Sequence, residues 1–154
     1  MNTLGLRASP KEVTFCVYSA EFDEIVNVEE VKIPNALDMP EKLKYIRATI
    51  LDILREFKIE YAGIRLTEFT AKKISVERIQ IEGVLLEAFA SSTLKGYFQG
   101  TLTTIASKLG EDKTRLSTLI KDGTADFERV EEWNQFSDKQ KEAILAALGA
   151  QNVE

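Results

Sequence analysis

The stretch "TLGLRASPKEVTFCVY", residues 3 to 18, decides the fold. Residues 3 to 6 and 12 to 18 are short runs rich in β-forming residues, and the segment "RASPK" between them contains a Ser-Pro turn signal. These two runs predict a β-hairpin. The next run, "EIVNVEEVKI" at residues 24 to 33, also has strand character, so three successive antiparallel strands are expected.

A change of period follows the third strand. The segment "IPNALDMP" interrupts the strand pattern, and Pro40 suits the first turn of a helix. Apolar residues then recur at intervals of three and four up to Phe57, which predicts a helix over residues 41 to 57 that packs on a sheet. Those residues are Leu43, Ile46, Ile50, and Ile53 or Leu54.

Further strands and helices alternate up to residue 98. Residues 60 to 66, "EYAGIRL", predict a fourth strand, and residues 94 to 98, "LKGYF", predict a fifth. The segment between them predicts a second helix over residues 75 to 91, and its expected core face consists of Ile79, Gly83, Leu86 and Ala90.

The last third of the chain is predicted to be helical. Thr101 can cap a helix that ends at Gly110, and Asp112 can cap another that ends before Gly123. Residues 124 to 136 show no clear period, and Trp133 and Phe136 are expected to anchor this loop. The segment "SDKQ" at residues 137 to 140 forms a capping-box pattern that opens a final helix through Leu148.

Length and composition indicate one domain, residues 1 to 154, of ordinary globular character, with 44% hydrophobic and 29% charged residues. No apolar run approaches the roughly 20 residues of a membrane helix, so we expect no membrane association and a cytoplasmic protein. The single cysteine, Cys16, is expected to be a small buried residue. The net charge of −5 means that any nucleic-acid site must be a local basic patch.

The absence of histidine excludes several kinds of chemistry. Neither a Ser-His-Asp triad nor a Cys-His pair can form, and one cysteine without histidine cannot make a usual zinc site. No phosphate-binding glycine motif occurs. Metal chemistry on carboxylates, or no chemistry at all, remains possible. We expect no cofactor.

The order of elements and several local stretches resemble the RuvC-type Holliday junction resolvases of the RNase H-like superfamily. This resemblance implies an α/β fold with a mixed five-stranded sheet, three antiparallel strands followed by two parallel ones, and helices on both faces. In that family the first strand ends in an aspartate, but "LGL" here is followed by Arg7. The fourth strand ends in a glutamate, but "YAGI" is followed by Arg65.

Two further family positions carry over less directly. The family's next helix has a glycine beside the sheet, and Gly83 in "IEGVLLEAF" matches it. Near the C-terminus the family has two aspartates three residues apart, and here "KQKEAILAAL" supplies Lys139 and Glu142. The resemblance therefore implies that one of four catalytic carboxylates is retained and that the other three positions are cationic.

These departures predict that a divalent metal pair is not bound and that the fold is catalytically inactive, because each metal ion needs converging carboxylates. The resemblance places Arg7 beside Arg65, with Glu142 facing them. Two interpretations stay open for the place where the family has its metal-binding catalytic site. The three residues form either a salt bridge that fills this place or an arginine pocket that binds phosphate. A rebuilt metal site from Glu12, Glu68 and Glu142 is a third possibility, although Glu68 lies three residues beyond position 65.

The remaining basic residues predict either a solvated face or a nucleic-acid surface. They flank the second helix and line the later helices: Lys72, Lys73, Arg78, Lys108, Lys113, Arg115 and Lys121. The function that we predict is a catalytically inactive domain that acts as a binding or assembly module, as a homodimer or a subunit of a nucleic-acid-related complex. The alternatives are a non-cutting binder of junction or duplex nucleic acid, and a metal-dependent nuclease with a rebuilt carboxylate site.

Overall fold

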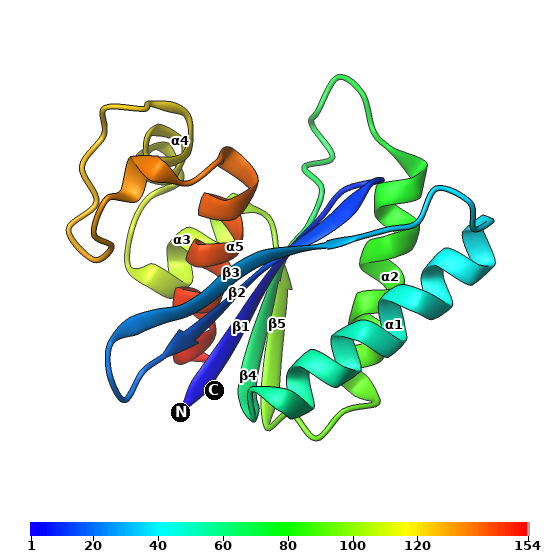
Figure 1. Cartoon of the computed structure of the whole chain (residues 1–154). Coiled ribbons are helices and arrows are strands. Elements are labelled where there is room, and N and C mark those ends of the chain that lie inside the picture. Colours follow the sequence, from blue (N-terminus) through cyan, green and yellow to red (C-terminus); the bar gives the residue numbers. More distant parts are fainter. Residues whose placement is uncertain (154) are drawn as a thin grey trace.

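Five strands form a mixed sheet in the computed structural model, which describes residues 1 to 153 (Figure 1). Their order across the sheet is β3-β2-β1-β4-β5. The pairings β1–β2 and β2–β3 are antiparallel, whereas β1–β4 and β4–β5 are parallel, which confirms the predicted α/β architecture. The strands are β1 (Asn2–Ala8), β2 (Glu12–Ser19), β3 (Glu24–Lys32), β4 (Ile59–Arg65) and β5 (Gly96–Gly100).

Helices cover both faces of this sheet (Figure 1). One face carries α1 (Met39–Glu56) and α2 (Val76–Ala90). The other face carries α5 (Asp138–Gly149), with α3 (Leu102–Leu109) and α4 (Lys113–Lys121) packed against it. Short 3-10 turns occupy Trp133–Gln135 and Ala150–Asn152. No helix among the described residues has both the length and the apolar character needed to cross a membrane.

The face under α1 and α2 is built from large aliphatic side chains. Leu4 and Leu6 of β1 are completely buried there with Ile50 of α1 and Leu85 of α2. These residues alternate along the strand and recur every three or four positions along the helices, as the sequence pattern predicts.

The opposite face brings α5 almost into backbone contact with the sheet. A Cβ added to Gly5 of β1 would lie 2.0 Å from the Ala143 carbonyl oxygen and 2.3 Å from the Ala147 amide nitrogen. A Cβ added to Gly63 of β4 would lie 2.9 Å from the Ala146 carbonyl oxygen. Only residues without a Cβ allow this approach, so the two glycines fix the position of α5 over β1 and β4.

The helix caps largely follow the sequence. Ser137 and Gln140 form the predicted capping box at the start of α5, and the Asp112 side chain accepts a hydrogen bond from the Arg115 amide. Gly110 ends α3 in a left-handed conformation, with φ of 69°. Thr101 precedes α3 as predicted, but its side chain makes no capping hydrogen bond. The carboxylate of Glu68 accepts from the Leu102 amide, the first of the helix.

Two predictions about α2 and β5 were wrong in detail. Ile79, Gly83 and Ala90 are exposed, and the core face of α2 is formed by Ile81, Leu85, Ala88 and Phe89. The helix has apolar residues on several sides, so its period alone did not identify the buried face. A Cβ at Gly83 would meet open space, so this glycine does not lie beside the sheet.

The fifth strand was predicted over residues 94 to 98, but β5 begins two residues later, at Gly96. Pairing with β4 sets its limits, since Gly96 lies opposite Tyr61 and Gly100 lies opposite Arg65. Cys16 is fully buried, as predicted, and burial raises the pKa of its thiol.

Candidate functional site: an arginine cluster at the ends of the central strands

The parallel strands β1 and β4 bring Arg7 and Arg65 together. The two residues lie opposite each other in the strand register, near the carboxyl ends of the two central strands. Arg7 follows Gly5 by two positions and Arg65 follows Gly63 by two positions. Because side chains alternate along a strand, both arginines lie on the face that α5 covers.

Glu142 of α5 lies between these two guanidinium groups. Its Oε2 is 3.2 Å from Arg7 Nε, and its Oε1 is 2.8 Å from Arg65 Nε. Only the Arg7 contact has the alignment of a hydrogen bond, since Arg65 Nε is buried without an aligned acceptor. The side chains of Arg65 and Glu142 are 8% and 9% exposed, so this is a buried arrangement of two cations and one carboxylate.

Glu68 joins the same arrangement from the segment after β4. Its Oε2 lies 2.7 Å from Arg65 Nη1 and accepts a hydrogen bond of 3.0 Å from the Leu102 amide at the start of α3. Its Oε1 lies 3.7 Å from Lys113 Nζ of α4. Strand β4 ends at Arg65, so the alternation of side chains does not continue to Glu68 and its carboxylate can turn back toward Arg65.

Arg78 and Glu82 of α2 supply a further ion pair. Arg78 Nε donates to Glu82 Oε2 at 3.0 Å, and the Glu82 carboxylate also accepts from the amide and hydroxyl of Thr67. Burial lowers the pKa of Arg78, with a further contribution from the charge of Arg7. The Nη2 atom of Arg78 is buried and has no hydrogen-bond partner within residues 1 to 153.

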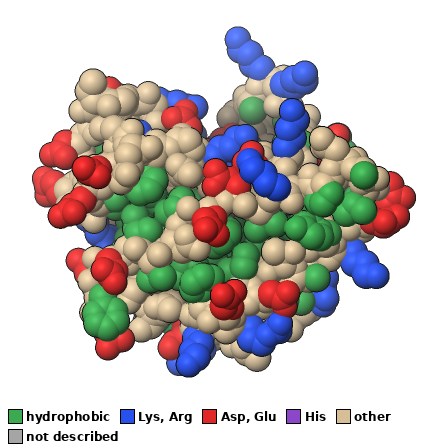
Figure 2. All heavy atoms as spheres, viewed as in Figure 1, with side chains coloured by type: hydrophobic (Ala, Val, Ile, Leu, Met, Phe, Trp, Pro, Cys, Tyr) green, Lys and Arg blue, Asp and Glu red, His purple; other side chains and the backbone are tan. Residues whose placement is uncertain are grey.

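We call these side chains the arginine cluster. It contains four cationic side chains and three carboxylates, and therefore one more positive than negative charge: Arg7, Arg65, Arg78 and Lys113 against Glu68, Glu82 and Glu142. Figure 2 shows basic and acidic side chains together in a hollow between the helices on one side and the β4–α2 loop on the other.

Sequence reasoning missed Glu82, which is 5% exposed and accepts hydrogen bonds from two residues. The spacing of Arg78 and Glu82, four residues apart on a helix, was a signal that could have identified the pair. The bond from Glu82 to the Thr67 amide could not be predicted, because it depends on where the β4–α2 loop leaves the sheet.

Several predicted residues lie elsewhere. Lys139 is exposed, and among the described residues no ion pair connects it to the arginine cluster. Lys72 and Lys73 are exposed in the β4–α2 loop. Lys108 lies over the Phe98 ring, 5.8 Å from its centroid, and Arg115 donates to the Asp126 carbonyl. Of the seven basic residues considered, Arg78 and Lys113 belong to the cluster, while Lys121 pairs with Asp138.

The hypothesis of a rebuilt metal site from Glu12, Glu68 and Glu142 was wrong in its geometry. Glu12 lies on β2 and pairs with Lys32 of β3 at 3.2 Å, whereas Glu68 and Glu142 are bound to arginines. Within the described part of the chain, no three acidic or cysteine side chains converge as metal ligands would. Cross-strand attraction between neighbouring side chains explains why Glu12 stays with Lys32.

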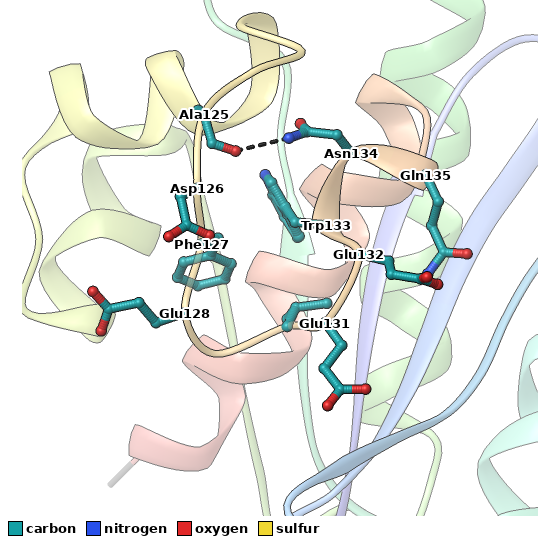
Figure 3. Close-up of a pocket in the computed structure, with 10 residues that line it drawn as sticks. Ala125, Asp126, Phe127, Glu128, Glu131, Glu132, Trp133, Asn134 and Gln135 are labelled. Carbon is teal, nitrogen blue, oxygen red and sulfur yellow. Dashed lines mark hydrogen bonds between the residues drawn. The ribbon is translucent and has the colours of Figure 1, made fainter.

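An open pocket lies in the loop before α5 (Figure 3). Its lining includes four acidic residues, Asp126, Glu128, Glu131 and Glu132. Trp133 is buried, donates its indole N–H to the Leu119 carbonyl at 2.8 Å and packs edge-on against Phe127. Trp133 therefore anchors the loop as predicted. The acidic lining would repel phosphate groups, so the arginine cluster is a better candidate for a phosphate site than this pocket.

The strand order, the parallel pairing of β4 with β1 and the position of α5 define an RNase H-like fold of the RuvC type. Thermus thermophilus RuvC has the same fold over 100% of this chain and 99% of its own, with a TM-score of 0.67 and 15% identity. T. thermophilus RuvC in complex with Holliday junction substrate matches 97% of this chain and 92% of its own, with a TM-score of 0.66 and 16% identity.

The yeast mitochondrial Holliday junction resolvase Ydc2 is a more distant neighbour. It matches 97% of this chain and 78% of its own length, with a TM-score of 0.59 and 15% identity. No protein-family model and no curated protein matches the sequence. At these identities the likeness establishes the fold, and the chemistry must be argued from the residues of this chain.

Proposed function

We propose that this chain is a catalytically inactive RuvC-like domain that acts as a binding or assembly module in a nucleic-acid-related complex. One observation carries the proposal. The RuvC-type resolvases, which this chain resembles, have an aspartate and a glutamate at the strand positions of Arg7 and Arg65. In this chain both arginines contact Glu142.

Electrostatics supports the loss of metal-dependent cleavage. A guanidinium about 4 Å from a divalent cation repels it by roughly 8 kcal/mol at an effective dielectric constant of about 20. Two such groups stand at the ends of β1 and β4, and both oxygens of Glu142 already lie against them. A metal pair would have to displace these arginines before it could use the carboxylate.

The role of a binding or assembly module is supported by exposed apolar side chains in the β4–α2 loop and the first turn of α2. Phe69 is 75% exposed and Val76 is 67% exposed, and Ile74 and Ile79 between and after them are exposed too. The exposed Lys72 and Lys73 lie in the same segment. Large apolar side chains exposed in one short segment are typical of interaction sites, so we propose that this segment contacts a second copy of the chain or another subunit.

A non-cutting nucleic-acid binder is the second candidate. The surplus positive charge of the arginine cluster favours it, together with the exposed Lys72 and Lys73 on the adjacent loop. Binding of this kind should weaken steeply as salt increases, because phosphate contacts release counterions. A weak dependence on salt, combined with formation of a stable dimer or larger assembly, would favour the assembly role alone.

A cleavage assay tests the proposal. Purified protein should leave labelled Holliday junctions, duplex DNA and RNA–DNA hybrids intact in the presence of magnesium or manganese. The variant Arg7→Asp should also remain inactive, because Arg65 would still occupy the end of β4. Cleavage that survives repurification and disappears in Glu142→Gln, but not in the matched surface variant Glu87→Gln, would overturn the proposal.

A further inference from the structure

The arginine cluster contains more hydrogen-bond donors than the protein uses. Arg7 donates through Nε to Glu142 and through Nη1 to the Ala8 carbonyl. Arg65 donates through Nη1 to the Leu66 carbonyl. Within residues 1 to 153, neither Nη2 of these arginines forms a hydrogen bond, and the buried Nη2 of Arg78 has none either.

The carboxylates of the cluster have little capacity left to accept from these donors. Glu142 already contacts two arginines, and Glu68 is shared by Arg65, Lys113 and the Leu102 amide. Glu82 accepts from Thr67 and Arg78. Buried guanidinium groups normally have partners, so the unpaired buried Nη2 of Arg78 and the surplus positive charge of the cluster together favour the binding of an anion.

The three arginines gather near the carboxyl ends of β1 and β4. Arg7 and Arg65 are adjacent across two paired strands. Glu82 holds Arg78 near the end of β4, because its carboxylate accepts from Arg78 Nε and from the amide of Thr67, two residues after Arg65. Arg7 and Arg78 keep 16% and 15% of their side chains exposed, so the cluster is open to solvent at these two residues.

We propose that Arg7, Arg65 and Arg78 together bind one phosphate group through their free Nη2 donors. Planar guanidinium groups with several fixed donors match the oxygens of phosphate, and one singly charged phosphodiester would balance the surplus charge of the cluster. The phosphate is bound and not cleaved. The expected source, a nucleic-acid strand, rests on the proposed function, whereas the phosphate site itself does not.

Titration with inorganic phosphate tests the site directly. The probe is added at constant ionic strength while the Nε–H signals of the arginines are followed by ¹H–¹⁵N NMR. We expect saturable shifts at Arg7, Arg65 and Arg78, and no change at Arg47 and Arg55, which pair with surface carboxylates. Unchanged signals in the cluster, or equal shifts at Arg47 and Arg55, would overturn the proposal.

A pair of matched variants extends this test. Arg78→Gln should weaken phosphate binding by about tenfold or more, whereas Arg47→Gln should leave it unchanged. Equal affinity in the two variants would contradict a role for Arg78. The wild-type titration needs no substitution, so a folding defect in Arg78→Gln would not prevent a decision.

An oligonucleotide titration then identifies the source of the phosphate. Duplex and junction DNA should bind in competition with inorganic phosphate and should shift the same three arginine signals. If Arg78→Gln bound DNA with the same affinity as the wild-type protein, the proposed function would stand but this inference would be overturned. Phosphate binding without any DNA binding would retain the site and remove the nucleic-acid part of the proposed function.

Discussion

The two faces of the sheet are packed in different ways. Under α1 and α2, bulky side chains such as Leu6, Ile50 and Leu85 fill the space between the layers. Under α5, the absence of a side chain at Gly5 and Gly63 allows the helix backbone to approach the strands. One face is held by side-chain volume and the other by close backbone contact.

This difference explains where the arginine cluster can form. Interlocking aliphatic side chains can adjust by small rearrangements, whereas a helix in backbone contact with two glycines has little freedom to slide. The start of α5 is therefore fixed relative to the ends of β1 and β4. As a result, Glu142 is held between Arg7 and Arg65, where it can contact both.

The largest expected effect is for Gly5→Ala. The new Cβ would meet backbone atoms of α5 at 2.0 and 2.3 Å, so the helix must move and its contacts with Arg7 and Arg65 must change. We expect the free energy of unfolding, measured by urea denaturation, to fall by more than about 3 kcal/mol.

Gly83→Ala on α2 is the matched control for that substitution. Its Cβ would meet open space in the middle of a helix, so the free energy of unfolding should rise by up to about 1 kcal/mol. If Gly5→Ala and Gly83→Ala had the same effect, the contrast between the two faces would be wrong.

A smaller but still large effect is expected for Glu142→Ala. Its removal leaves Arg7 and Arg65 close together without the carboxylate between them, and loss of one member of such a buried ion pair should lower the free energy of unfolding by about 3 kcal/mol. Urea denaturation should show this loss. The surface pair Arg47–Glu87 serves as a control, because Glu87→Ala removes an exposed carboxylate and should change stability little. If Glu142→Ala and Glu87→Ala lowered the free energy of unfolding by similar amounts, the buried contacts of Glu142 would contribute no more than a surface ion pair.

Much of the fold could be predicted from the sequence, because its signals are local. The turn in "RASPK", the apolar period from Leu43 to Phe57 and the capping box at Ser137 each act over a few residues. The buried face of α2 was not predicted, because its apolar residues surround the helix. The limits of β5 depend on its pairing with β4, and this pairing cannot be read from a local sequence pattern.

The arginine cluster could be predicted in part. The resemblance to the RuvC-type resolvases placed Arg7 beside Arg65 with Glu142 facing them, and the structure brings these three residues together. The contributions of Glu68 and Glu82 could not be predicted, since both depend on the path of the chain after β4. Lys139 was expected beside Glu142, but its exposed side chain remains outside the cluster.

The smallest expected effect compares the first turns of α5 and α2, which lie on opposite faces. Ser137 and Ser75 each accept one hydrogen bond of 3.2 Å, from the Gln140 amide and the Arg78 amide respectively. Ser137→Ala and Ser75→Ala should each lower the free energy of unfolding by about 1 kcal/mol, because an amide at the helix start loses its acceptor. Ser137→Thr should keep most of the stability. We expect Ser137→Ala and Ser75→Ala to lose the same stability, whereas Gly5→Ala and Gly83→Ala differ. That result would show that the two faces of the sheet differ in how closely the helices pack on it and not in how the helix ends are capped. Unchanged stability in Ser137→Ala would instead show that the first turn of α5 is held by contacts other than its cap.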